Sequence, residues 1–221
     1  MSDSARIIMT FKCDKACVGC ANTYGSIMSK AQPLYSIKQL EGYKNLVISG
    51  GEPMLFPDRT MKLAKILKKS VPGAKIFLYT SMNKDSNLME KILPYIDGVN
   101  FTIHSQADDK DIMEFQSFQA MAGKHPDKAF RLYVDKATSK EVHILPSVWD
   151  RVNIKPWMGE KDMEAAGGCP EDLYYLGKPE AKHKVPPPGP RPPAQTFSKQ
   201  KAPITENVHY CECCQMFRKI L

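Results

Sequence analysis

The sequence predicts an α/β fold, a partial (β/α)6 barrel that is an open relative of the TIM barrel. Short β-branched and aromatic runs recur roughly every 20–35 residues, and the segments between them have the apolar spacing of amphipathic helices. This alternation is typical of βα units with parallel strands. Six strands are too few to close the eight-stranded barrel, so we expect an open sheet.

The strands and helices can be placed along the first part of the chain. One helix is expected over residues 58–70, with Asp58 as its N-cap and Pro72 beyond its end. A second helix is expected over residues 86–96. The expected strands cover residues 6–11, 45–49, 75–80, 98–103, 129–134 and 151–155.

The composition changes after Trp157. Eight of the 17 prolines lie within residues 179–203, and the chain then ends in HYCECCQMFRKIL. A segment so rich in proline favours an extended connector or strap over a regular helix or central strand. We therefore expect a barrel domain, residues 1–157, and a proline-rich, cysteine-containing extension, residues 158–221.

Composition and charge make some classes of function less favoured, among them nucleic-acid binding and membrane insertion. The net charge is +7, but no run of five or six Lys or Arg occurs, which does not favour nucleic-acid binding. No signal peptide and no apolar run of the ~18 residues that a membrane helix needs is seen. We expect a cytoplasmic protein without a membrane partner, and in that compartment clustered cysteines favour metal binding or catalysis over disulfides.

Residues 13–20 read CDKACVGC, a C-x3-C-x2-C motif directly after the first expected strand. Three interpretations compete: buried inert thiols, a zinc site, or an iron–sulfur cluster. Zinc would need a further ligand from the distant C-terminus, whereas three thiolates on a cubane cluster leave one iron open for another ligand. The end of a parallel strand is also where active sites gather.

A second motif makes this region resemble the radical S-adenosylmethionine (radical SAM) superfamily. Residues 46–53 read LVISGGEP, so that Gly50, Gly51, Glu52 and Pro53 follow the second expected strand, as the family's GGEP motif does. Both motifs follow strands and stand in the family's order. The resemblance covers residues 1–157 and does not extend to the tail.

The resemblance implies an enzyme in which Cys13, Cys17 and Cys20 hold a [4Fe–4S] cluster and SAM binds its open iron. A donor such as flavodoxin or ferredoxin reduces the cluster, and SAM is cleaved to methionine and a 5′-deoxyadenosyl radical that abstracts hydrogen from a substrate. Glu52 and the glycine carbonyls of GGEP would accept hydrogen bonds from the methionine ammonium, and Pro53 would fix the turn.

Polar residues at the other strand ends are expected to complete the cofactor site by holding the ribose hydroxyls or the methionine carboxylate. For each one, an ordinary polar strand end is the alternative. Residues 153–156 also resemble the family's last-strand segment, which lies against adenine. The candidates are Thr80 and Ser81, His104 and Ser105, and Arg131 and Lys155.

One position departs from the family pattern. The residue before the third cysteine is often aromatic in this family and packs on adenine, but here it is Gly19. Tyr24 or Phe11 would then have to supply that contact. Activases that install a glycyl radical in a partner enzyme have a similar C-x-G-C ending, which keeps a peptide or protein substrate open.

Four cysteines remain outside the motif. They are candidates for an auxiliary iron–sulfur cluster or a zinc ion, for plain thiols or a redox disulfide, or for substrate handling. The C-x-C-C spacing near the C-terminus is not the usual C-x2-C knuckle. These cysteines are Cys169, Cys211, Cys213 and Cys214.

Three functions therefore stay open on the sequence alone. The first is a radical SAM enzyme acting on a peptide or protein, and the second is one acting on a nucleotide-derived small molecule. The third is a metal-binding scaffold without catalysis, with iron–sulfur or zinc as its metal. We expect the extension to fold back over the open side of the barrel, because an uncovered sheet exposes its edges and lets water reach a radical.

Overall fold

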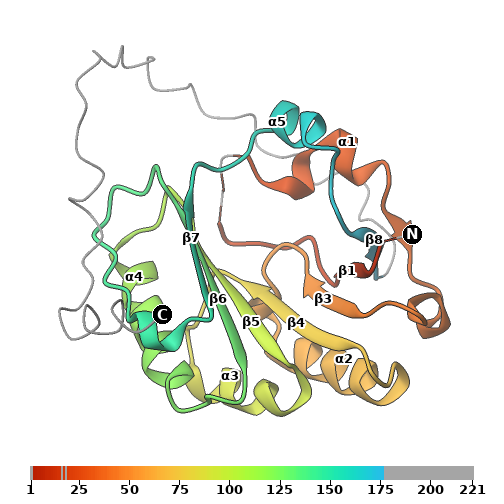
Figure 1. The fold of residues 1–221 in the computed structure, drawn as a ribbon, viewed down its shortest axis with the longest axis horizontal. Coiled ribbons are helices and arrows are strands. Elements are labelled where there is room, and N and C mark those ends of the chain that lie inside the picture. Colours follow the sequence, from red (N-terminus) through yellow and green to blue (C-terminus); the bar gives the residue numbers. More distant parts are fainter. Residues whose placement is uncertain (1, 16, 18, 177–221) are drawn as a thin grey trace, which may run out of the picture.

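A computed structural model describes residues 2–15, 17 and 19–176 of the chain. Within these residues, eight strands form one sheet in the order β2-β8-β1-β3-β4-β5-β6-β7 (Figure 1). Every pair of neighbouring strands is parallel. The first and last strands of this order do not pair, so the structure confirms the α/β class and the open barrel.

The six expected strands are all present, and two short strands join them. The strands are β1 (Ser4–Ile8), β2 (Gln32–Pro33), β3 (Asn45–Ser49), β4 (Lys75–Thr80), β5 (Gly98–Ile103), β6 (Ala129–Asp135), β7 (Arg151–Lys155) and β8 (Asp172–Tyr175). The helices are α1 (Gly25–Met28), α2 (Pro57–Ser70), α3 (Ser86–Ile92), α4 (Asp109–Ala122) and α5 (Glu160–Ala165).

Two expected boundaries are wrong in detail. Phe56, not Asp58, is the N-cap of α2, because Pro57 occupies the first helical position, where its missing N–H costs nothing. The first strand ends at Ile8 rather than residue 11. Residues 10–12 leave the strand because their carbonyls bond to the loop after β3, as described below.

The sheet continues beyond residue 157. Strand β8 pairs with β1 on one side and with β2 on the other. Residues 158–176, which the sequence places in the extension, thus contribute β8 to the same sheet and form α5 before it. The rest of the extension, with Cys211, Cys213 and Cys214, lies outside the described residues.

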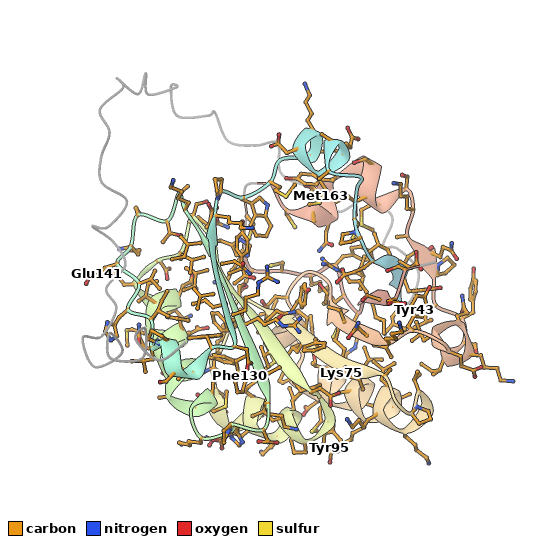
Figure 2. The ribbon with its side chains drawn as sticks, viewed as in Figure 1. Tyr43, Lys75, Tyr95, Phe130, Glu141 and Met163 are labelled. Carbon is orange, nitrogen blue, oxygen red and sulfur yellow. The ribbon has the colours of Figure 1, made fainter. Side chains whose placement is uncertain are left out.

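The convex face of the sheet packs against α2, α3 and α4 (Figures 1 and 2). Phe118 of α4 contacts the rings of Phe101, Phe130 and Trp149 at centroid distances of 4.8, 5.7 and 5.7 Å. Because side chains alternate along a strand, the residues between these core positions face the opposite, concave side. The functional residues are drawn from that side and from the strand ends.

The first part of the extension is anchored on the segment that follows the cysteine motif. Met163 of α5 packs against a small cluster formed by Tyr24, Ile27 and Leu173, so that α5 lies beside α1 (Figures 1 and 2). The side chain of Glu160 accepts hydrogen bonds from the backbone and hydroxyl of Ser26 at 3.0 and 2.9 Å. Of the helices described here, none is long and apolar enough to cross a membrane.

Candidate functional site

The loop that carries the cysteines is bonded directly to the GGEP loop. The backbone N–H of Gly51 donates to the carbonyl of Thr10 at 2.6 Å, and that of Glu52 donates to Lys12 at 2.9 Å. Residues 10–12 thus run along the loop after β3 as an irregular continuation of β1. These bonds place Cys13, the next residue, against the second motif.

Glycine is required in the GGEP loop because the two backbones lie so close together. A Cβ on Gly50 would lie 2.3 Å from the carbonyl oxygen of Thr10, and one on Gly51 would lie 2.1 Å from that of Lys12. Gly50 also has a φ of +142°, which L side chains rarely adopt. No other residue type allows this contact without displacing the cysteine loop.

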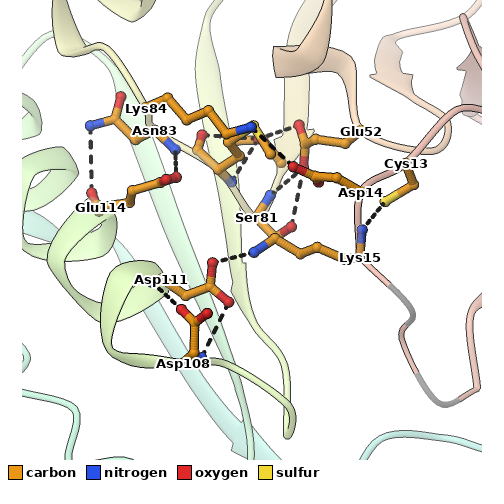
Figure 3. A network of polar contacts seen from close by, with 12 residues as sticks. Cys13, Asp14, Lys15, Glu52, Ser81, Asn83, Lys84, Asp108, Asp111 and Glu114 are labelled. Carbon is orange, nitrogen blue, oxygen red and sulfur yellow. Dashed lines mark hydrogen bonds and ion pairs between the residues drawn. The ribbon is translucent and has the colours of Figure 1, made fainter.

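Glu52 joins the loop after β3 to the end of β4. Its carboxylate accepts hydrogen bonds from Met54 N at 2.8 Å and from the Thr80 hydroxyl at 2.7 Å. It also accepts two from Ser81, from the backbone N at 2.9 Å and the hydroxyl at 3.1 Å (Figure 3). The side chain is 2% exposed, and this burial raises its pKa despite the four donors.

Polar contacts hold the cysteine loop from several sides. Asn22 donates from its side chain to the carbonyl of Gly50 at 2.6 Å. Lys15 forms an ion pair with Asp111 at the start of α4, and Asp14 pairs with Lys84 at 3.0 Å (Figure 3). A cavity of about 250 Å³ lies beside these pairs, lined in part by Lys15, Lys84 and Asp111.

Trp157, just beyond β7, occupies the space beside Gly19. Its indole N–H donates to the carbonyl of Gly19 at 2.5 Å. Gly19 has a φ of +77°, and a Cβ there would lie 2.7 Å from the Tyr24 hydroxyl and 2.9 Å from the indole ring. The tryptophan ring also packs on His104 and Tyr133, at centroid distances of 4.9 and 5.5 Å.

The three cysteines share one cavity with the GGEP loop, which we call the cysteine pocket. Its volume is about 120 Å³. Cys13 is exposed, and Cys17 and Cys20 are partly buried. The residues that line it are Arg6, Cys13, Lys15, Cys17, Cys20, Ala21, Asn22, Ser49, Gly50, Gly51, Glu52, Tyr79, Thr80, Ser81, Thr102, His104 and Trp157.

Comparison of the sequence with known protein families identifies the family of this chain. The model of the radical SAM superfamily matches residues 7–143, more than half of the 221 residues. The chain belongs to the radical SAM superfamily. No curated protein matches it.

The crystal structure of BtrN in complex with AdoMet and 2-DOIA is among the solved structures similar to this radical SAM chain. The two are 14% identical, with a TM-score of 0.43. The match covers 60% of this chain and 56% of that one, so the chain spans little more than half the length of that structure.

The donor set in the pocket fits the iron–sulfur cluster that the radical SAM family uses. Although Cys13 is exposed as a residue, partial burial of its thiol raises its pKa, and burial together with the neighbouring thiols raises the pKa of Cys17 to about 12. Iron binding would supply the positive charge that removes these protons. Among the described residues no three His, Cys, Asp or Glu converge on a single metal ion. Each iron of a cubane takes its own ligand, so thiolates around a cluster do not converge on one point.

The cofactor candidates from the sequence fall into two groups. Thr80, Ser81 and His104 line the cysteine pocket, although the hydroxyls of the first two are already bonded to Glu52. Burial, and then Lys15, lower the pKa of His104 to about 4, so its imidazole is neutral near pH 7. The other three candidates, Ser105, Arg131 and Lys155, are not among the residues that line this pocket.

Sequence reasoning missed Trp157 and Asn22, and it named two aromatic residues that are engaged elsewhere. Tyr24 is 7% exposed, and its hydroxyl donates to the carbonyl of Met158 at 3.0 Å. Phe11 packs near Tyr175, at a centroid distance of 6.5 Å. The available signal was the position of Trp157 one residue past the segment that resembles the family's adenine-facing strand.

Proposed function

We propose that this chain is a radical SAM enzyme in which Cys13, Cys17 and Cys20 ligate a [4Fe–4S] cluster. The observation that supports this most is the direct bonding between the cysteine loop and the GGEP loop within one pocket. When bound, the cluster and SAM supply the reductive cleavage that produces a 5′-deoxyadenosyl radical. The protein's part is to hold both cofactors, to orient them and to exclude water.

The methionine end of SAM would meet the GGEP loop through backbone oxygens. The four donors on Glu52 take up the roughly four acceptor sites of a carboxylate. The carbonyl of Gly51 is then a better acceptor for the ammonium group than the Glu52 side chain. Glu52 acts mainly by holding that carbonyl, through the loop, in a fixed orientation.

The adenine would pack on Trp157. This side chain lines the cysteine pocket and takes the space that an aromatic residue at position 19 would need. The role that the family often gives to the residue before the third cysteine is thereby transferred to the end of β7. Gly19 is then explained by this exchange, so the C-x-G-C ending is not by itself a reason to assign a glycyl-radical activase.

The function is tested by anaerobic reconstitution with iron and sulfide, followed by reduction with dithionite or with flavodoxin or ferredoxin. Formation of 5′-deoxyadenosine from SAM, lost in Cys17→Ala, would support the enzyme. If the reconstituted wild type binds iron but forms no 5′-deoxyadenosine under any reductant, the non-catalytic scaffold would replace it. Metal analysis of the triple cysteine variant would report separately on Cys169 and the three cysteines of the tail as an auxiliary iron–sulfur or zinc site.

A further inference from the structure

Two arginines on the concave face stack on two rings of the same strand. Arg6 of β1 lies over the ring of Tyr79 at 4.9 Å, and Arg131 of β6 lies over that of Phe77 at 4.5 Å. Both rings belong to β4 and lie two residues apart on one face, about 7 Å along the strand. The two guanidinium groups therefore reach β4 from its opposite sides (strands in Figure 1).

The two arginines differ in how their charge is balanced. Arg6 forms a partly buried ion pair with Glu171, which leaves its Nη atoms without a hydrogen bond in the described part of the chain. Arg131 has no ion pair among the described residues, and the residues opposite it in register are Asn100 and Arg151. Arg131 therefore places an unbalanced positive charge on this face, since the guanidinium does not deprotonate in proteins.

Asn100 lies between the two arginines with an unused acceptor. It pairs in register with Tyr79 on one side and with Arg131 on the other, so its side chain shares their face. Its Oδ1 atom is buried and has no hydrogen-bond partner among the described residues. The Asn100 side chain also lies beside the Tyr79 hydroxyl, and its Oδ1 atom is available to accept a hydrogen bond from a bound molecule.

The same face leads up to the cysteines. Arg6, Tyr79 and Thr102 line the cysteine pocket together with Cys13, Cys17 and Cys20. A molecule anchored between the arginines would therefore extend along the concave face toward the place where the radical forms. No cysteine or GGEP residue is needed for the anchor itself.

We propose that Arg6, Asn100 and Arg131 form an anion site for the substrate, which we call the arginine site. The substrate is a small molecule that bears a carboxylate or phosphate group, with an N–H or O–H group beside it that donates to Asn100. The inference rests on the proposed function, because it assigns the arginine site to the substrate of that reaction. It also replaces the earlier expectation that Arg131 pairs with the carboxylate of SAM.

The test is equilibrium dialysis of the reconstituted, unreduced protein with saturating SAM, against labelled inorganic phosphate and labelled succinate. Without reductant SAM stays intact, so its carboxylate site is filled. We expect one equivalent of at least one anion to bind, and the preferred probe tells phosphate from carboxylate recognition. Arg131→Gln and the isosteric Asn100→Asp should each weaken binding at least tenfold, and Arg131→Lys should restore part of it.

Arg59→Gln is the matched control, since Arg59 also stacks on a ring, that of Phe56 at 5.7 Å, but lies on α2. It should bind the anion as the wild type does. Three results overturn the inference: no anion binds the wild type, Arg131→Gln and Asn100→Asp both bind like the wild type, or SAM abolishes binding. Thermal unfolding of each variant separates lost binding from lost folding, and Asn100→Asp retains the shape of the site if Arg131→Gln does not fold.

The two proposals can fail separately in the wild-type protein. Formation of 5′-deoxyadenosine without anion binding would refute the arginine site and leave the enzyme assignment intact. Anion binding that depends on Arg131, without 5′-deoxyadenosine under any reductant, would refute the radical SAM activity and leave the arginine site as a binding site only.

Discussion

Gly51→Ala tests whether the close contact between the two motifs positions the cysteines that we propose as cluster ligands. The new Cβ would lie 2.1 Å from the carbonyl oxygen of Lys12 and 2.9 Å from the carbonyl carbon of Phe11. Both are backbone atoms, so no side chain can rotate away. The φ of Gly51 is not positive, and the effect of the substitution is therefore steric alone.

The cost can be worked from the contacts that must break. The N–H bonds from Gly51 to Thr10 and from Glu52 to Lys12 contribute roughly 0.5–1.5 kcal/mol each. Overpacking adds about 1–3 kcal/mol. We expect the free energy of unfolding to fall by about 3 kcal/mol, which a domain of ordinary stability survives. Because Cys13 follows Lys12, iron content should fall to less than half of the roughly four atoms per chain of a cubane.

Urea unfolding and iron analysis after anaerobic reconstitution measure the two effects. Gly25→Ala is the matched control, because the nearest atom to its Cβ would be Glu160 Oε1 at 3.9 Å. It should change stability by no more than about 0.5 kcal/mol and leave iron loading unchanged. Gly73 has a φ of +88° and no atom near its Cβ position, so Gly73→Ala measures backbone strain alone. We expect it to lower the free energy of unfolding by about 1 kcal/mol without loss of iron. If Gly51→Ala matched Gly25→Ala in both measurements, the contact would not position the ligands.

Four further predictions test other parts of the site. Cys17→Ala should lose most of the iron, and full iron content in the triple variant of Cys13, Cys17 and Cys20 would refute the ligand assignment. Trp157→Ala should weaken SAM binding about tenfold by calorimetry, since base–aromatic stacking contributes about 1–3 kcal/mol. Trp157→Phe keeps a ring and should lose less SAM affinity. Unchanged affinity in Trp157→Ala would contradict the adenine contact. Glu52→Gln replaces an acceptor oxygen by a donor that faces Thr80 or Ser81 and should destabilise the fold by about 1–3 kcal/mol. A variant as stable as the wild type would contradict the role of Glu52 in joining the loop after β3 to the end of β4. Burial and Lys15 lower the pKa of His104 to about 4, so between that pH and 6.5 the unfolded chain binds more protons than the folded one. The free energy of unfolding should therefore rise by up to about 3 kcal/mol as pH increases through this range. An equally steep rise in His104→Gln would show that His104 is not the group responsible.

The barrel and the two motifs could be predicted from the sequence because their signals are local. The expected and observed limits of β3, β4, β5 and β7 agree, since each of these strands is a continuous run bounded by turn residues. Strand β8 gives no such signal: it has four residues and is set by pairing with β1, about 165 positions away in the chain.

The contacts that complete the site could not be predicted, because they depend on packing between distant segments. Trp157 meets Gly19 across 138 positions, and Arg6 meets Glu171 across 165. Nothing near Asn100 in the sequence distinguishes its side chain from any other polar position of an alternating strand. Its buried acceptor, which has no hydrogen-bond partner in the part of the chain that the structure describes, emerges only when β4 and β6 are placed on either side of it.

The contacts of GGEP change how a loss of activity in that motif should be interpreted. Gly50 and Gly51 allow the cysteine loop to dock, and Glu52 ties that loop to the end of β4. A substitution at any of the three can therefore remove activity by displacing a proposed cluster ligand, without any contact to SAM. Only a variant with full iron content and weakened SAM binding would demonstrate a direct role in holding SAM. The structure predicts that combination for Trp157→Ala, and the opposite one, lost iron, for Gly51→Ala.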